Sequence, residues 1–335
     1  MTSINCGIVG YGRSGKNIHH KLISKTKGIS LVSICDIDIQ KISAGVSKKI
    51  KIYKKYNKFL ENHEISLVII SARSKDLFWM TKQALMKRKN VIVEKPFCQN
   101  INELNEIDKL TKIMKCKVIP FFNFRYSDSY IKIQELINKK AIGDIFLVKR
   151  KVSYFNRRND WQSKKSEMGG IINAAAIHHI DEVINLFNSK PKIEYIQKKN
   201  IVSKGDADDH MKLILSFKKK ITVDIEVSWA EAFDTHLWEL YGTKGAIKQS
   251  KNSLTIRSFN RSNVRKTKIN RLDYIQGERI NWKIKKIKLS SNFDNGKFIN
   301  FYKKTVLFLN GNAESPINFK SLVKTFSVVE KINRI

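Results

Sequence analysis

Lys95 is the first residue of this sequence whose type and position could serve chemistry. It lies in the segment Val91-Ile92-Val93-Glu94-Lys95-Pro96, directly after an apolar strand. In an open parallel sheet the carboxyl ends of the strands border the ligand crevice, so we expect Lys95 to point to a bound ligand. A surface lysine before a turn proline is the plainer interpretation of the same residues.

His178 is the second such residue, and it follows a segment that begins with Gly169-Gly170. The small residues after these glycines predict a helix that packs very close to its surroundings. His178 and Asp181 are three residues apart and share one face of this helix, whereas His179 points elsewhere. Because an imidazole has an ordinary pKa of about 6.5, His178 is a candidate for acid-base chemistry near neutrality. A purely structural histidine is the alternative.

A glycine fingerprint lies close to the N-terminus. Gly10, Gly12 and Gly15 follow the apolar run 6–9 and precede a helical pattern. In this geometry the first glycine makes a tight turn, the second lets the backbone approach a pyrophosphate, and the third lets helix and strand pack closely. Asp36 ends the next apolar strand about 20 residues later, the position of a carboxylate that binds an adenosine ribose. The pattern predicts dinucleotide binding and favours NAD over NADP, because an acid repels a 2′-phosphate; a glycine-rich turn in another α/β protein is the alternative.

Composition and charge limit the classes of protein. The chain has 335 residues, of which 42% are hydrophobic and 10% aromatic, which is long enough for two globular domains. It has 64 Lys and Arg residues against 30 Asp and Glu residues, a net charge of +34. The lysines are spread over the whole chain, and no nucleic-acid-binding motif accompanies them. As the cause of the high charge, we therefore favour a drift of composition toward Lys, Ile and Asn over nucleic-acid recognition. A positive field would still attract an anionic substrate.

The sequence shows neither a signal peptide nor an apolar stretch that could span a bilayer, so we expect a cytoplasmic protein without a membrane partner. Its four cysteines are Cys6, Cys35, Cys98 and Cys116. They form no Cys-x-x-Cys pair and no Cys/His cluster. We therefore expect reduced, mostly buried thiols and neither a disulfide framework nor a metal site.

Hydrophobic periodicity predicts an α/β fold with two kinds of sheet. In the first 120 residues, apolar strands at 5–9, 30–35, 67–71, 90–93 and 117–121 alternate with helices after Gly12, Ile39, Asp76 and Ile101. This alternation is typical of a doubly wound parallel sheet. Later strands at 145–154, 193–198, 211–217, 221–227, 236–241 and 247–256 alternate apolar and polar residues, which favours an antiparallel sheet. Helices are expected at 130–138, 171–186 and 318–332, and residues 258–295 read as a polar excursion with one hairpin.

The order of these motifs resembles that of the glucose-fructose oxidoreductase/inositol dehydrogenase (Gfo/Idh/MocA) family from end to end. The resemblance rests on the fingerprint with Asp36, Glu94-Lys95-Pro96, Asn123-Phe124-Arg125, the turn 141–144, Trp161, His178-x-x-Asp181 and the segment 241–245. It implies an NAD-binding Rossmann domain at 1–122. It also implies a substrate-binding α+β domain at 123–335, whose large, mostly antiparallel open sheet would form a homodimer or homotetramer.

The resemblance also implies a reaction: hydride transfer between NAD(P) and a hydroxyl or keto group of a sugar, cyclitol or nucleotide-linked sugar. Lys95 would contact the reacting oxygen, and His178 would take or return its proton. The implied cofactor residues are Gly10, Gly12, Arg13, Ser14, Gly15, Asp36, Ser71, Glu94, Lys95 and Asn123. The implied substrate residues are Arg125, Trp161 and Asp181.

Departures from the family pattern leave a second function open. Many members carry an aspartate one helical turn before the histidine, where this chain has Ala174. Ala72-Arg73, Leu77 and Gln162 also replace residues that are common in the family. A cofactor-binding sensor or scaffold with little or no turnover is therefore the alternative to an NAD-dependent sugar or nucleotide-sugar dehydrogenase or reductase.

Overall fold

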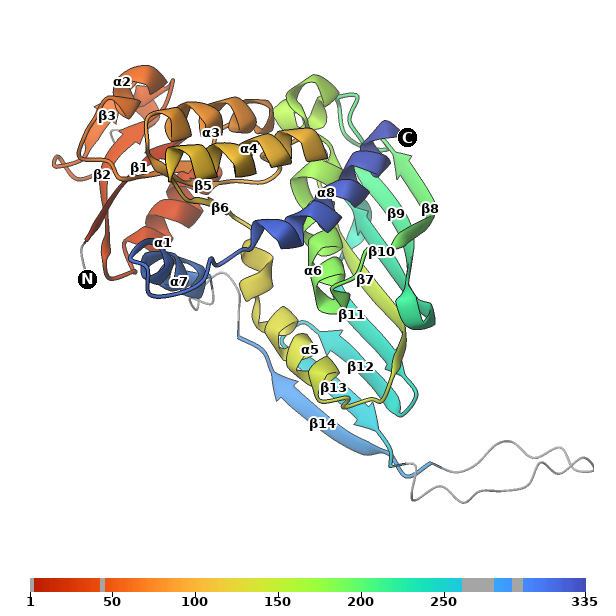
Figure 1. Cartoon of the computed structure of the whole chain (residues 1–335). Helices are drawn as coiled ribbons and strands as arrows, with labels where there is room; N and C mark the ends of the chain where they lie inside the picture. Colours follow the sequence, from red (N-terminus) through yellow and green to blue (C-terminus); the bar gives the residue numbers. More distant parts are fainter. Residues whose placement is uncertain (1–2, 43–45, 261–279, 291–297) are drawn as a thin grey trace, which may run out of the picture.

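The computed structural model describes residues 3–42, 46–260, 280–290 and 298–335, and it contains two sheets (Figure 1). The first has six parallel strands in the order β3-β2-β1-β4-β5-β6. Their bounds are β1 (Ile4–Val9), β2 (Ile29–Cys35), β3 (Lys51–Tyr53), β4 (Leu67–Ile70), β5 (Asn90–Val93) and β6 (Val118–Pro120). The predicted doubly wound parallel sheet is confirmed, and only the short strand β3 was not foreseen.

The helices of this part are α1 (Lys21–Ile23), which continues a π-helical turn (Gly15–His20), α2 (Tyr56–Leu60), α3 (Leu77–Met86) and α4 (Ile101–Met114). Where a helix was expected after Ile39, the described residues form only a 3-10 turn (Ile39–Lys41), and the chain enters the sheet as β3 at Lys51. Residues 43–45 of the expected helix lie outside the described residues. Strand β4 is buried along its whole length, which explains its continuous apolar sequence.

The strand order creates the crevice that parallel sheets use for ligands. From β1 the chain builds β2 and β3 on one side, and then β4, β5 and β6 on the other. Ligands bind at such a switch point, beyond the carboxyl ends of the strands. Gly10 follows β1, Ser71 follows β4 and Glu94 follows β5, so three predicted site segments lie along this edge.

The second sheet has eight strands in the order β14-β13-β12-β11-β7-β10-β9-β8. Their bounds are β7 (Ile145–Phe155), β8 (Lys192–Lys199), β9 (His210–Phe217), β10 (Ile221–Ser228), β11 (Ala230–Gly242), β12 (Gly245–Ser250), β13 (Ser253–Ser258) and β14 (Lys283–Lys288). Only β7 and β10 pair in parallel, so the expectation of a mostly antiparallel sheet is confirmed. The single strand expected at 247–256 is a hairpin, β12 and β13, that turns at Lys251 and Asn252.

After β6, the described residues form the helices α5 (Asp128–Asn138), α6 (Ile177–Phe187), α7 (Ile299–Leu309) and α8 (Phe319–Arg334). Helices α6 and α8 pack on each other, and Figure 1 shows both on one face of the sheet. Helix α7 was not predicted, and it lies beside α1, against the first sheet (Figure 1). In the predicted polar excursion, β14 extends the sheet from β13, and the excursion's residues 261–279 and 291–295 lie outside the described residues.

The four thiols are free, and three of them, Cys6, Cys35 and Cys98, are buried, as expected. Among the described residues, no helix combines the length and the apolar character that a membrane crossing requires. The division of the chain at residues 122 and 123 stays a prediction.

Candidate active site

The glycine turn after β1 has the shape of a pyrophosphate cradle. Gly10 has φ of +81°, and a Cβ there would lie 2.6 Å from the carbonyl oxygen of Ser71. A Cβ on Gly15 would lie 2.1 Å from the carbonyl oxygen of Gly10. The fold itself therefore requires these two glycines. By contrast, a Cβ on Gly12 would meet no described atom within 4 Å, so this glycine leaves open space of the kind a close phosphate needs.

Ser71 and Asp36 hold this turn in place from the two neighbouring strands. The Ser71 hydroxyl donates to the carbonyl oxygen of Gly10 at 2.7 Å. The backbone N–H of Tyr11 donates to Asp36 Oδ2 at 2.6 Å, and that of Asp38 donates to Oδ1 at 2.9 Å. The Asp36 carboxylate is thus fixed at the end of β2 beside the turn, where a ribose-binding acid is expected. These residues fit a dinucleotide.

Glu94 connects the glycine turn to the end of β5. Its Oε1 accepts a short hydrogen bond from the Ser14 hydroxyl and lies 3.2 Å from Nε2 of His19. Burial alone would raise the pKa of Glu94, but the hydrogen bond and charge of His19, the charge of Lys95 and the bond from Ser14 lower it below its ordinary value. The carboxylate is therefore held ionised beside Lys95.

Lys95 reaches from β5 to the helix that carries His178. Its Nζ donates to the carbonyl oxygen of Ala174 at 2.5 Å and lies 3.5 Å from that of Asn173. Both carbonyls belong to a π-helical turn (Ile172–Ala176) that leads into α6, and such turns are frequent at functional sites. Burial lowers the pKa of Lys95 to about 8; the charge of Glu94 opposes this shift and that of Arg13 adds to it.

His178 is 7% exposed at the start of α6. Its ring centroid lies 4.6 Å from that of Phe124 and 5.9 Å from that of Phe122. Its Nδ1 is buried without a hydrogen-bond partner among the described residues. Burial, with the charges of Lys95 and His179, holds the pKa of His178 well below its ordinary value, so the imidazole is neutral at pH 7.

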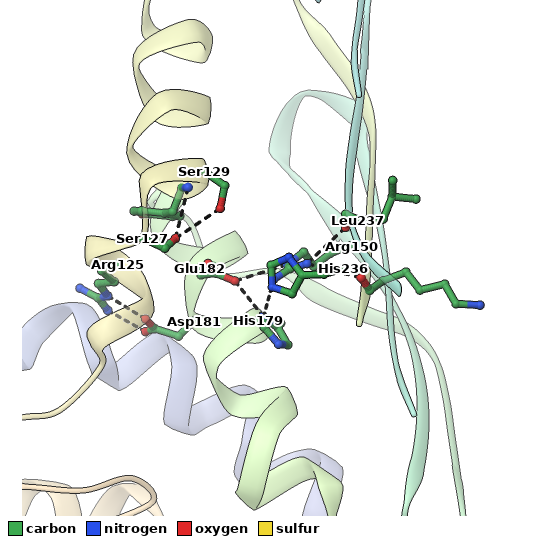
Figure 2. Close-up of polar contacts among 11 residues, drawn as sticks. Arg125, Ser127, Ser129, Arg150, His179, Asp181, Glu182, His236 and Leu237 are labelled. Carbon is green, nitrogen blue, oxygen red and sulfur yellow. Dashed lines mark hydrogen bonds and ion pairs between the residues drawn. The ribbon is translucent and has the colours of Figure 1, made fainter. Parts of the chain in front are cut away.

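Two buried networks hold helix α6 from two sides, through Asp181 and Glu182 (Figure 2). On one side, Arg125 donates to both oxygens of Asp181, from Nη2 at 2.6 Å and from Nε at 2.7 Å. On the other, Arg150 of β7 lies 3.4 Å from Glu182, whose Oε2 is 2.8 Å from Nδ1 of His179. Burial raises the pKa of Glu182 to about 7, against the opposing charge and hydrogen bond of Arg150.

Most of the predicted cofactor residues lie together, since Asp36, Ser71 and Glu94 each form a hydrogen bond with the glycine turn and Lys95 follows Glu94 directly. Arg125 and Asp181 were expected at the substrate, yet they bind each other, with 10% and 1% of their side chains exposed. We assign this pair first to holding α6, and its contact with substrate stays a prediction. Asn123 is buried, Trp161 is half-buried, and their roles also stay predictions.

Sequence reasoning missed His19, Tyr302 and Phe124. His19 is fully buried, and its Nδ1 lies 2.6 Å from the hydroxyl of Tyr302 on α7. A histidine four residues after the last glycine was a visible signal. The repeat of Phe298, Phe301, Tyr302 and Thr305 was the signal for α7.

Together, the parallel sheet, the glycine turn and the fixed acid define a dinucleotide-binding protein. Residues 4–122 match the family model of oxidoreductases with an NAD-binding Rossmann fold, and residues 130–248 match the model of the GFO/IDH/MocA C-terminal domain. The chain belongs to the Gfo/Idh/MocA family.

Relatives of known name include two sugar or cyclitol dehydrogenases. The chain is 24% identical to inositol 2-dehydrogenase of Salmonella typhimurium over 255 residues, which cover 72% of this chain and 73% of that protein. It is 29% identical to glucose-6-phosphate 3-dehydrogenase of Bacillus subtilis over 241 residues, 66% of this chain and 67% of that protein.

Solved structures share the fold over nearly the whole chain. An NAD-binding protein from Listeria innocua superimposes with a TM-score of 0.83 at 22% identity, covering 99% of this chain and 94% of the other. A protein proposed to be an NADPH-dependent oxidoreductase, from Desulfitobacterium hafniense, superimposes with a TM-score of 0.80 at 15% identity, covering 99% and 95%.

Proposed function

We propose that this protein is a dehydrogenase or reductase that transfers hydride between NAD and a hydroxyl or keto carbon of a sugar, cyclitol or nucleotide-linked sugar. The observation that carries the proposal is the meeting of Lys95 with the helix turn that leads to His178, beside the glycine cradle. The names of the Salmonella and Bacillus relatives support the substrate class.

The chain's own residues would hold the cofactor at the edge of the parallel sheet. The glycine turn would receive the pyrophosphate, and Asp36 would bind the adenosine ribose and disfavour a 2′-phosphate. Nicotinamide, when bound, supplies the site that accepts or gives the hydride. The preference for NAD is part of the proposal, since the neighbour from D. hafniense is proposed to use NADPH.

Lys95 and His178 would have different roles at the reacting hydroxyl: Lys95 would stabilise its oxygen, and His178 would transfer its proton. The Lys95 ammonium has three N–H donors; it contacts two carbonyls and keeps a donor for the substrate oxygen. It would stabilise negative charge that develops on that oxygen. His178, neutral at pH 7, would accept the hydroxyl proton in oxidation and return it in reduction.

A second candidate, a cofactor-binding sensor or scaffold, is favoured by one specific observation. Nδ1 of His178 is buried without a partner among the described residues, and Ala174 supplies no carboxylate near it. A histidine that no acid orients is a weaker base. The protein would then bind NAD tightly and turn over slowly or not at all.

Two measurements separate these candidates. NADH fluorescence titration tests binding, and a screen of hydride transfer over sugars, cyclitols and nucleotide sugars tests turnover. For the enzyme we expect turnover on at least one substrate, its loss in His178→Ala, and an NAD affinity that stays nearly unchanged in that variant. Tight NADH binding without turnover on any substrate would contradict the enzyme proposal and support the sensor. A His178→Ala variant with full rate would show that another group moves the proton.

A homodimer or homotetramer through the large sheet is proposed as well. Arg150 faces α6, so its neighbour Lys151 lies on the opposite face, where it pairs with Glu226 at 2.7 Å. Lys212 pairs with the same carboxylate at 2.8 Å. With α6 and α8 on its other face, this is the face of the sheet through which two copies would pair. Light scattering tests it: we expect at least two copies per particle, and a monomer at micromolar concentration contradicts the proposal.

A further inference from the structure

His19 is a fully buried histidine that the proposed reaction does not use, and it lies between two parts of the chain that are far apart in sequence. It belongs to the π-helical turn after the glycine fingerprint, and its ring centroid is 4.4 Å from that of Phe121. Nε2 lies 3.2 Å from Oε1 of Glu94, and Nδ1 lies 2.6 Å from the hydroxyl of Tyr302. The imidazole therefore joins helix α7 to the cofactor edge of the parallel sheet.

The chemistry of the groups fixes the direction of the hydrogen bond to Glu94. An ionised carboxylate only accepts, so Nε2 of His19 carries a proton and donates to Glu94. The Tyr302 hydroxyl can donate to Nδ1 of a neutral imidazole or accept from Nδ1–H of a charged one. Burial holds the pKa of Tyr302 well above its ordinary value, so this hydroxyl keeps its proton. In either form, hydrogen bonds join α7 through His19 to Glu94.

Glu94 is the point at which this chain reaches the cofactor site. The same Oε1 also accepts from the hydroxyl of Ser14, a residue of the glycine turn. The next residue is Lys95, whose ammonium the Glu94 charge stabilises. A rotation of the Glu94 carboxylate would therefore disturb the turn and the lysine together.

We propose that His19 and Tyr302 are positioning residues of the cofactor site: the α7 hydroxyl fixes the orientation of the His19 ring, and His19 holds the Glu94 carboxylate between Ser14 and Lys95. This inference rests on the proposed function, because it assumes that a dinucleotide binds at this edge. It adds that the C-terminal part of the chain, through α7, sets the affinity for the cofactor.

The charged groups around Lys95 give the inference a signature that a merely structural role would not produce. Burial and the charge of Arg13 disfavour the charged form of Lys95, whereas the charge of Glu94 favours it. His178 and His179 also feel the Lys95 charge, and both are neutral at pH 7. Glu94 is thus the neighbour that sustains the ammonium. If the carboxylate is released, the pH at which Lys95 loses its proton falls below the present value of about 8.

The test is NADH binding by fluorescence between pH 6 and pH 10, for the whole chain and four variants. His19→Leu removes the donor to Glu94, His19→Gln keeps an N–H at that place, and Tyr302→Phe removes only the hydroxyl. Tyr56→Phe is the matched control, because it removes a buried tyrosine hydroxyl that donates to the carbonyl oxygen of Met80 at 2.7 Å, outside the network. Thermal unfolding checks that each variant folds.

We expect the NADH dissociation constant at pH 7 to rise about two- to tenfold in Tyr302→Phe and at least as much in His19→Leu, as for the loss of one hydrogen bond. His19→Gln should recover most of the affinity, and Tyr56→Phe should match the wild type. If the Lys95 ammonium contributes to NADH binding, the affinity should fall as the pH rises through the pKa of Lys95, and this alkaline midpoint should lie at lower pH in His19→Leu than in the wild type.

Variants that match Tyr56→Phe in affinity and in midpoint would overturn the inference and leave the proposed function intact. Wild-type protein that binds neither NADH nor NADPH would overturn both. If His19→Leu does not fold, Tyr302→Phe and His19→Gln decide the question: equal affinity in wild type and Tyr302→Phe overturns the inference.

Discussion

The substitution Ala174→Asp tests how His178 works. Ala174 lies four residues before His178 in the π-helical turn, and its carbonyl oxygen accepts from Lys95 at 2.5 Å. A carboxylate here would lie close to both side chains and would give His178 a negatively charged neighbour. At present His178 is buried beside the Lys95 ammonium, and its pKa is held well below the ordinary value.

The size of the effect follows from the distance. Two unit charges about 4 Å apart interact by about 4 kcal/mol at an effective dielectric constant of about 20. An opposite charge at such a distance shifts a pKa by about 1 to 3 units. We therefore expect the pKa of His178 to rise by about 1 to 3 units, because the carboxylate stabilises the imidazolium. A stronger base accepts the substrate proton faster, and we expect the oxidation rate at pH 8 to rise by about three- to tenfold.

Two assays check this, and the first needs no substrate. Nitrogen NMR of the imidazole follows the protonation of His178 in Ala174→Asp and in the neutral control Ala174→Asn. Below its new pKa the imidazolium cannot act as a base, so the oxidation rate of Ala174→Asp should fall with an acid limb that the wild type does not show at the same pH. Equal pKa values for His178 in the two variants would refute the reasoning. A raised pKa without a faster rate would mean that His178 does not move the proton.

Four further substitutions probe the cradle and its support. Gly12→Ala should leave the unfolding temperature nearly unchanged and weaken NADH binding at least about tenfold. Gly15→Ala should unfold at lower temperature, since its Cβ would lie 2.1 Å from a carbonyl oxygen. If the two variants behave alike, the glycine turn is not a pyrophosphate cradle. Asp36→Ser should raise the NADPH affinity relative to NADH in fluorescence titrations, and an unchanged ratio would remove the acid from cofactor choice. Arg125→Met leaves the carboxylate of Asp181 buried without its partner, so urea unfolding should show a loss of about 3 to 5 kcal/mol; a loss below about 1 kcal/mol would show that water reaches the carboxylate.

Much of the cofactor half of the site could be predicted because its signals are local. The glycine turn and Asp36 lie within one strand-helix-strand unit, where spacing alone determines what meets. Lys95 was found because it follows a buried strand, and a parallel sheet brings such ends to one edge. The helix that carries His178 was found from its small residues, although its π-helical first turn was not.

The parts that could not be predicted depend on contacts between distant residues. His19 and Tyr302 are separated by 283 positions, and the sequence around either residue does not indicate that it contacts the other. The pairing of Arg125 with Asp181 is of the same kind, because each residue alone is as well suited to a substrate as to a partner. Of the helix expected after Ile39, the described residues show only a 3-10 turn at Ile39–Lys41, and residues 43–45 lie outside them.

Among the ionisable side chains of helix α6, Asp181 and Glu182 hold the helix in place, whereas His178 is the proposed base. Asp181 and Glu182 are both buried, and each contacts an arginine from a different element, so the helix is restrained against rotation about its axis. His178 is therefore held in one position, and its pKa depends on the groups that surround it there. Burial and, after it, the charge of Lys95 keep His178 neutral. It follows that a ligand which places negative charge between Lys95 and His178 would raise the pKa of His178, whereas a neutral ligand would leave it low. Substrate whose oxygen gains negative charge during hydride transfer meets this requirement, which links the strength of the base to the reaction that needs it.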